Sequence, residues 1–115
     1  MPLYQTTLGN IPAGTRLVPY SARISSNATT TPTSTVCYVS SISITVEAGG
    51  TGSTIVIRDK SGTPLILVDG LVTTAINTTP NVLNFETPVK MIGGIDIITA
   101  GVAAATVSVW INYYQ

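Results

Sequence analysis

Ser41-Ile42-Ser43-Ile44-Thr45-Val46-Glu47 alternates polar side chains with β-branched apolar ones. Successive side chains of a strand point to opposite faces, so this period of two places Ile42, Ile44 and Val46 on one face. The stretch therefore predicts an antiparallel strand with one face buried and one face open to solvent. The glycine-rich segment Ala48–Gly52 follows and predicts the turn that ends this strand.

The next part of the chain predicts a β-hairpin. Two apolar runs, Thr54–Arg58 and Thr63–Val68, flank the short connection Asp59-Lys60-Ser61-Gly62. Apolar runs joined by a short connection that contains glycine are typical of two paired antiparallel strands. Both runs are apolar at successive positions, and we therefore expect both to be covered on their two faces.

The remaining pattern predicts further short strands and one long polar loop. Residues Ser25–Thr35 are rich in Ser, Thr, Asn and Pro, which is typical of a loop. The further strands are expected at Leu71–Ile76, Val82–Glu86, Val89–Ile92, Ile95–Thr99 and about Ala105–Tyr114. About eight short strands, separated by turn residues and without helices, predict an all-β fold: an antiparallel β-sandwich, and more narrowly a jelly roll. We expect a single domain over residues 14–115, preceded by an extended N-terminal arm over residues 1–13.

The composition indicates a surface that other molecules cover. Charged residues make up 9% of the chain, whereas about 25% is usual in a soluble domain. Apolar residues make up 44%, which is an ordinary value, so the deficit lies in the surface and not in the core. Thr, Ser, Asn and Gly fill the places that Lys and Glu usually hold. This surface suits a protein that packs against other subunits, and we expect a homo-oligomer.

Charge and hydropathy also argue against two classes of partner. Five basic residues balance five acidic ones, and no Lys/Arg cluster is present to bind a phosphate backbone or anionic lipid. The segment Met91–Ile111 is long enough to cross a bilayer, but it contains Asp96 and alternates polar with apolar residues in its second half. We therefore expect neither nucleic acid nor membrane as a partner. The first residues lack the pattern of a secretory signal, which predicts that the protein is made in the cytoplasm and not exported.

The sequence offers no catalytic constellation. The chain contains no histidine, and therefore lacks the usual general base at neutral pH and the imidazole that binds metals. Its five carboxylates lie on different expected strands and turns, where Asp59 and Asp69 are expected to cap their own backbone. We predict that the protein is not an enzyme and uses no cofactor or metal. Cys37 lies in an apolar stretch and is expected to be a core residue; the alternative, a nucleophile or an intersubunit bridge, lacks a cationic neighbour.

Two sets of residues are candidates for an interface with another subunit or with a partner protein. In the last expected strand, the residues that face away from the core include Trp110, Asn112 and Tyr114. Trp and Tyr are enriched at binding hot spots, although a segment of the same chain could also cover this row. The second set consists of the apolar residues of the N-terminal arm, which either remain disordered or add to the edge of a partner's sheet: Leu3, Tyr4, Leu8 and Ile11.

Three segments of the C-terminal half carry a resemblance to a known group of proteins. They are Thr54-Ile55-Val56-Ile57-Arg58-Asp59-Lys60-Ser61-Gly62, Asn84-Phe85-Glu86-Thr87-Pro88-Val89-Lys90-Met91-Ile92-Gly93-Gly94-Ile95, and Thr99-Ala100-Gly101 followed by Thr106-Val107-Ser108-Val109-Trp110-Ile111. In these segments the chain resembles small β-sandwich structural proteins of tailed bacteriophages. The resemblance implies a virion protein without catalytic residues, and we favour a capsid decoration, or cement, protein. It would sit on the capsid surface, bind the major capsid protein, and form a trimer in preference to a dimer.

Two other functions stay open at this point. The chain could be the head domain of a tail fibre or spike that binds a cell-surface glycan, with Trp110, Tyr4, Tyr38 and Tyr113 stacking on sugar rings. It could also be a pilus or matrix subunit, which the missing secretory signal disfavours.

Overall fold

The computed structural model describes residues 11–48, 53–61, 65–72, 81–101 and 106–115. These residues form eight strands joined by turns, and they contain no helix. The strands are β1 (Leu17–Ile24), β2 (Ala28–Thr33), β3 (Cys37–Ala48), β4 (Ser53–Asp59), β5 (Ile66–Val72), β6 (Asn81–Met91), β7 (Ile95–Ala100) and β8 (Thr106–Tyr114).

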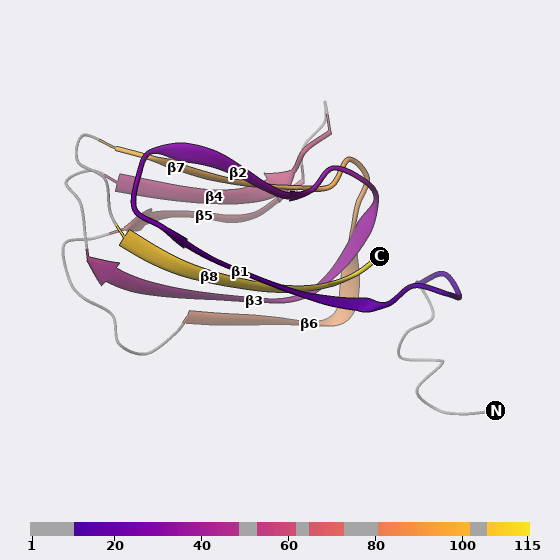
Figure 1. The fold of residues 1–115 in the computed structure, drawn as a ribbon. Helices are drawn as coiled ribbons and strands as arrows, with labels where there is room; N and C mark the ends of the chain where they lie inside the picture. The colour runs from indigo at the N-terminus through magenta and orange to yellow at the C-terminus, as the bar shows by residue number, and fades with distance from the viewer. Residues whose placement is uncertain (1–10, 49–52, 62–64, 73–80, 102–105) are drawn as a thin grey trace.

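The strands form two four-stranded antiparallel sheets that lie face to face (Figure 1). One sheet has the order β1-β8-β3-β6 and the other the order β2-β7-β4-β5. The predicted antiparallel β-sandwich is therefore confirmed. Among the paired strands, only β4 and β5 follow each other directly in the chain, and every other pair joins strands that are distant in sequence. This order is compatible with a jelly roll, and that finer assignment stays a prediction.

The core fills the space between the two sheets. In β8 the burial alternates strictly, with Val107, Val109, Ile111 and Tyr113 buried, as the sequence pattern predicted. The buried core cluster also draws on β1, β3, β4, β6 and β7, and its members outside β8 are Ile24, Cys37, Val39, Ile42, Ile44, Ile55, Ile57, Met91, Ile95 and Ile97. Isoleucine dominates this set. Its branched side chain suits the pleated surface of a strand and fills the interior between two sheets.

The predicted loop over Ser25–Thr35 is wrong, because β2 lies inside it. Threonine is a good strand former, and neighbouring β7 supplies the pairing. The Thr99 hydroxyl accepts the backbone N–H of Ala28 at 3.1 Å and donates to the carbonyl of Ser26 at 2.7 Å. These bonds join residues more than 70 positions apart, so a local reading of the sequence does not reveal them.

No strand was predicted over β1, and the bounds of β5 and β6 differ from those expected. Strand β5 runs through Asp69-Gly70, which was expected to be a turn, and the strand expected at Leu71–Ile76 is its continuation as far as Val72. Strand β6 is continuous across Thr87-Pro88, where two separate strands were expected, and its pairing with β3 shifts register there. The expectation that the β4–β5 hairpin is covered on both faces is wrong for β5, since Ile66 is 50% exposed.

One buried carboxylate ties the end of β4 to the turn between β6 and β7. Asp59 is almost fully buried, and its two oxygens accept the backbone N–H groups of Ser61 at 2.9 Å, Ile92 at 2.7 Å and Gly93 at 2.8 Å. We call Asp59 with these three N–H groups the Asp59 clamp. Burial opposes ionisation of Asp59, but the hydrogen bonds outweigh this effect and hold the pKa of the carboxyl below its usual value.

Two glycines allow the turn to approach the clamp. A Cβ atom on Gly93 would lie 2.7 Å from the backbone nitrogen of Ser61, which is closer than side chains come in folded proteins. Gly94 has φ +100°, and a Cβ atom on it would clash with the backbone oxygen of Thr33, so both its conformation and the space around it require glycine. Gly93 and Gly94 are therefore required by the packing of this turn.

We predict that Asp59→Asn lowers the free energy of unfolding by about 2–4 kcal/mol. The Asn side chain keeps one acceptor oxygen and replaces the other with an NH₂ group, which cannot accept a hydrogen bond from a backbone N–H. Each buried N–H donor left without an acceptor costs about 1–3 kcal/mol. Urea unfolding of the two proteins measures the difference. The control is Asp69→Asn, which changes an exposed carboxylate and should shift the free energy by no more than about 0.5 kcal/mol. Equal effects of the two changes would contradict the structural role of the clamp.

The clamp also predicts a loss of stability in acid. Because the folded-state pKa of Asp59 lies below the unfolded value, its contribution is fully present above the unfolded pKa of about 3.9. It is lost as the pH falls through the lower, folded pKa. Urea unfolding at pH 6 and at steps below pH 4 should show this loss in the natural sequence and a smaller loss in Asp59→Asn. Identical pH profiles would count against the clamp.

Candidate functional site

The outer face of the β1-β8-β3-β6 sheet, which points away from the core, holds the tryptophan that the sequence singled out. The register places Ser21 of β1 and Ser43 of β3 on either side of Trp110 in β8. Because both neighbours are small, the indole is not covered from either side, and Trp110 is 57% exposed. The first candidate site is therefore a sheet face with one open aromatic ring among hydroxyl groups.

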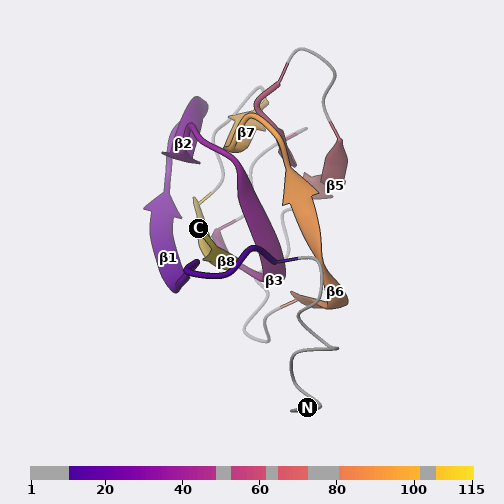
Figure 2. The same cartoon turned by 90° about the vertical axis from the view of Figure 1, so that its right-hand side faces the viewer.

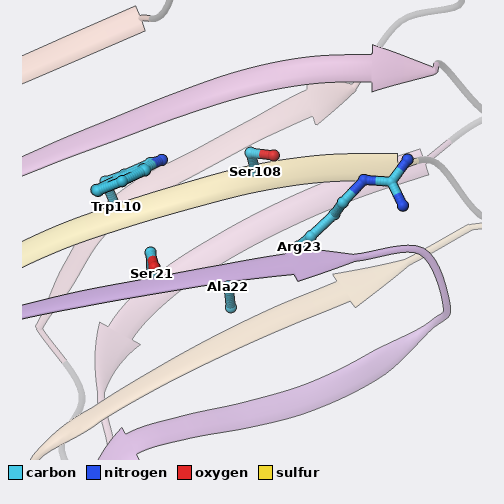
Figure 3. A pocket seen from close by; sticks show the side chains of 5 residues that line it. All are labelled: Ser21, Ala22, Arg23, Ser108 and Trp110. Atoms are coloured by element: carbon cyan, nitrogen blue, oxygen red, sulfur yellow. The ribbon is translucent and has the colours of Figure 1, made fainter.

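A shallow hollow lies beside this ring. It has a volume of about 220 Å³ and is lined by Ser21, Ala22, Arg23, Ser108 and Trp110. Figure 3 shows Trp110 and Ser108 on β8 and the Arg23 side chain reaching from β1 towards β8. The hollow therefore combines an aromatic surface, hydroxyl groups and a guanidinium, which suits contact with polar groups of a partner.

An ion pair spans three strands at one end of the outer face. The Arg23 Nε donates to Glu47 Oε2 at 2.9 Å, and the Ser108 hydroxyl donates to the same oxygen at 2.6 Å. The bond from Ser108, followed by that from Arg23, lowers the pKa of the Glu47 carboxyl. This group was not predicted from the sequence. The only signal for it is the register that sets Arg23 beside Ser108 and Ser108 beside Thr45, two residues from Glu47.

The other two residues of the predicted row lie on the same face but are less open than Trp110. The Asn112 Nδ2 donates to the Ser41 hydroxyl at 2.9 Å, so part of its hydrogen-bonding capacity is used within the sheet. Tyr114 is half-buried and lies between Leu17 and Tyr38 in the register. The structure thus places Trp110, Asn112 and Tyr114 together, and their contact with a partner stays a prediction.

The second predicted set lies largely beyond the part that the structure describes. Leu3, Tyr4 and Leu8 are outside the described residues, and Ile11 is half-buried at the start of them. How the arm lies relative to the row on β8 is therefore outside what the structure describes. The role of the arm, and its boundary at residue 13, stay predictions.

The carboxylates of the described strands are mostly engaged in structural contacts. Asp59 is held by the clamp, Glu47 is bound by Arg23, and the buried Asp96 accepts the Thr31 hydroxyl at 2.7 Å. Within the described ranges, no three His, Cys, Asp or Glu side chains gather as metal ligands would. Asp69 on β5 and Glu86 on β6 differ from the others because they are exposed.

A membrane-spanning helix is not found among the described residues.

Cys37 is a core residue, as predicted. It is fully buried, and burial, followed by the nearby charge of Asp59, raises the pKa of its thiol to about 12. The thiolate is the reactive form of cysteine, so almost none of the reactive species exists at neutral pH. A nucleophilic role for this residue does not fit its surroundings.

We predict that the Cys37 thiol reacts with a disulfide reagent such as DTNB only when the protein unfolds. In native buffer at pH 8 the reaction should be at least about 100-fold slower than in 6 M guanidinium chloride, because both burial and the raised pKa suppress the thiolate. The change in absorbance on release of the reagent's thiolate measures both rates. Comparable rates would show that Cys37 is accessible in the folded protein.

The two faces of β8 predict losses of different size for substitutions at neighbouring positions. Trp110→Ala removes a side chain that is more than half exposed, and should lower the free energy of unfolding by about 1 kcal/mol. Ile111→Ala removes a fully buried side chain, and should cost about 2–5 kcal/mol. Denaturant unfolding compares them. A larger loss for Trp110→Ala than for Ile111→Ala would contradict the assignment of the faces.

A comparison with protein-family models gives a match to the TonB-dependent Receptor Plug Domain over residues 13–108. The matched segment begins before β1 and ends within β8, so it includes strands of both sheets. No curated protein matches the chain. The matched segment excludes every residue predicted for the interface, since Leu3, Tyr4, Leu8 and Ile11 precede it and Trp110, Asn112 and Tyr114 follow it.

The match corrects the function expected from the sequence. The resemblance to bacteriophage structural proteins is wrong, and so are the two functions based on it, the capsid decoration protein and the glycan-binding tail fibre or spike. The expected location in a virion is wrong as well, because a plug domain points to the bacterial outer membrane. The expected partners, a major capsid protein and no membrane, conflict with the match, and the trimer argued from capsid symmetry loses its basis.

Proposed function

Because the chain belongs to the TonB-dependent receptor plug domain family, we propose that it acts as the plug of a TonB-dependent receptor in the bacterial outer membrane. The observation that carries this proposal is the match over residues 13–108, which covers seven strands completely and the start of the eighth. The plug would occupy the passage of the receptor and close it until the receptor is activated.

The surface of the sandwich is consistent with a plug that must be held and also released. Both outer faces present neutral hydroxyl groups, including Ser21, Ser43 and Thr45 on one sheet and Thr29 and Thr31 on the other. A neutral hydrogen bond contributes only about 0.5–1.5 kcal/mol, and bridging waters replace such bonds at low cost. Many weak hydrogen bonds together would fix the orientation of the plug in the receptor. They could be broken one at a time when the plug is released.

The low charge of the chain supports the same proposal. Inside a receptor the surface of the domain would be covered by the surrounding protein, so the charged side chains that keep a free domain soluble are not needed. The exposed ion pair of Arg23 with Glu47 balances its own charges and leaves no net charge on that part of the face. Contact with the receptor would then require little desolvation of unpaired ions.

We also propose that the domain has no catalytic activity. The absence of histidine from the chain and the engagement of Asp59, Asp96 and Glu47 in structural bonds support this. Closure of a passage needs shape and surface contacts and no chemical step.

Cell fractionation combined with photo-crosslinking tests the proposed function. In the bacterium that encodes it, the chain should appear in the outer-membrane fraction. A benzophenone side chain in place of Ser21, which is exposed on the outer face, should form a covalent adduct with an outer-membrane receptor under ultraviolet light. The same substitution at Thr29 probes the outer face of the other sheet, and the sample without light is the control.

The proposed function fails if the chain stays in the soluble fraction and neither position forms an adduct. An adduct at one position only would supply the orientation of the plug against the receptor, and would support the proposal.

A further inference from the structure

The four edge strands of the sandwich differ in one respect. An edge strand presents unpaired backbone N–H and C=O groups, and proteins commonly block such edges with proline. Strand β1 contains Pro19, β2 contains Pro32 and β6 contains Pro88, whereas β5, Ile66-Leu67-Val68-Asp69-Gly70-Leu71-Val72, contains none. Figure 2 shows β2 and β5 at opposite sides of their sheet. Among the described edges, β5 is the one that no proline interrupts.

Two apolar side chains at the start of β5 are also open to solvent. Leu65 is 47% exposed and Ile66 is 50% exposed, so a strand that lies beside them would bury apolar surface. In the described part of the chain, β5 pairs with β4 on one side, and no strand pairs with its other side. We propose that the free edge of β5 is a docking site for an extended segment of another polypeptide, which adds to the β2-β7-β4-β5 sheet as a fifth strand.

Asp69 decides which kind of strand can dock. It lies at the centre of β5, is exposed, and faces the uncharged Val56 in the pairing with β4. Two β5 strands from two copies of the chain, paired symmetrically and antiparallel, would place one Asp69 opposite the other. Like charges directly opposite each other destabilise a sheet, whereas opposite charges stabilise it. The edge therefore disfavours a second copy and fits a foreign strand with a Lys or Arg opposite Asp69 and apolar side chains next to Ile66.

This site goes beyond the proposed function, since a plug needs no strand addition to close a passage. The test uses the isolated chain, and its outcome does not depend on whether a receptor is found.

The experiment is a titration of the isotope-labelled full chain with a capped heptapeptide, Val-Thr-Val-Lys-Val-Thr-Val, followed by backbone amide hydrogen exchange. We expect slower exchange at amides of Ile66–Val72 and unchanged exchange in β1, β2 and β6. A peptide with Glu in place of the central Lys should bind about threefold to tenfold more weakly, because it sets two carboxylates opposite each other. The control peptide carries N-methyl groups on its valines, cannot complete the ladder, and should not bind.

Substitution of Asp69 separates the charge effect from strand addition. Asp69→Lys should reverse the preference so that the Glu peptide binds more tightly, and Asp69→Asn should remove the preference while both peptides still bind. The proposal is overturned if β5 amides are unaffected at millimolar peptide, or if β1, β2 or β6 is protected in their place. It is equally overturned if the preference is the same in all three chains, or if the chain alone protects β5 as its concentration rises.

Discussion

The structure depends on a single buried carboxylate that joins the two sheets at one end. Strand β6 belongs to one sheet and β7 to the other, so the turn between them must cross the sandwich. Asp59, at the end of β4, accepts two backbone N–H groups of this turn, and Gly93 and Gly94 let the turn come close enough to donate them. The carboxylate stays ionised although it is buried, because its oxygens receive hydrogen bonds in place of water. Without the clamp, the crossing would leave backbone donors buried and without an acceptor.

The strands that could be predicted from the sequence are the central ones, and those that could not are the edges. Strands β3, β4, β7 and β8 each have a neighbour on both sides, and their alternating or continuous apolar residues gave clear signals. Strands β1, β2, β5 and β6 were missed, divided or given wrong bounds. Pro19, Pro32 and Pro88, and the Asp69-Gly70 pair, are residues that usually indicate turns. In an edge strand proline limits pairing with other molecules, so the residues that protect β1, β2 and β6 also obscure these strands in the sequence.

The candidate site shows a similar division. The period of two in β8 was sufficient to place Trp110 on the outer face and Ile111 in the core. It was not sufficient to bring Arg23, Glu47 and Ser108 together, because that contact depends on the register of three strands that are distant in the chain. The sequence likewise predicted that Asp59 caps its own turn, which the bond from Ser61 confirms. The two donors from the β6–β7 turn lie more than 30 residues away, and only the fold reveals them.

The clamp also explains why the resemblance to bacteriophage proteins misled the assignment of function. The segments that carried it contain Asp59, Ser61, Gly93 and Gly94, which are the residues that the crossing between the sheets requires. A sandwich that closes its end in this way needs a carboxylate, a tight turn and small residues, whatever the protein does. Such a motif therefore indicates the fold and does not indicate the function of the protein. The deficit of charge indicated a covered surface but did not identify the covering molecule, and a receptor satisfies that physical requirement as well as a capsid does.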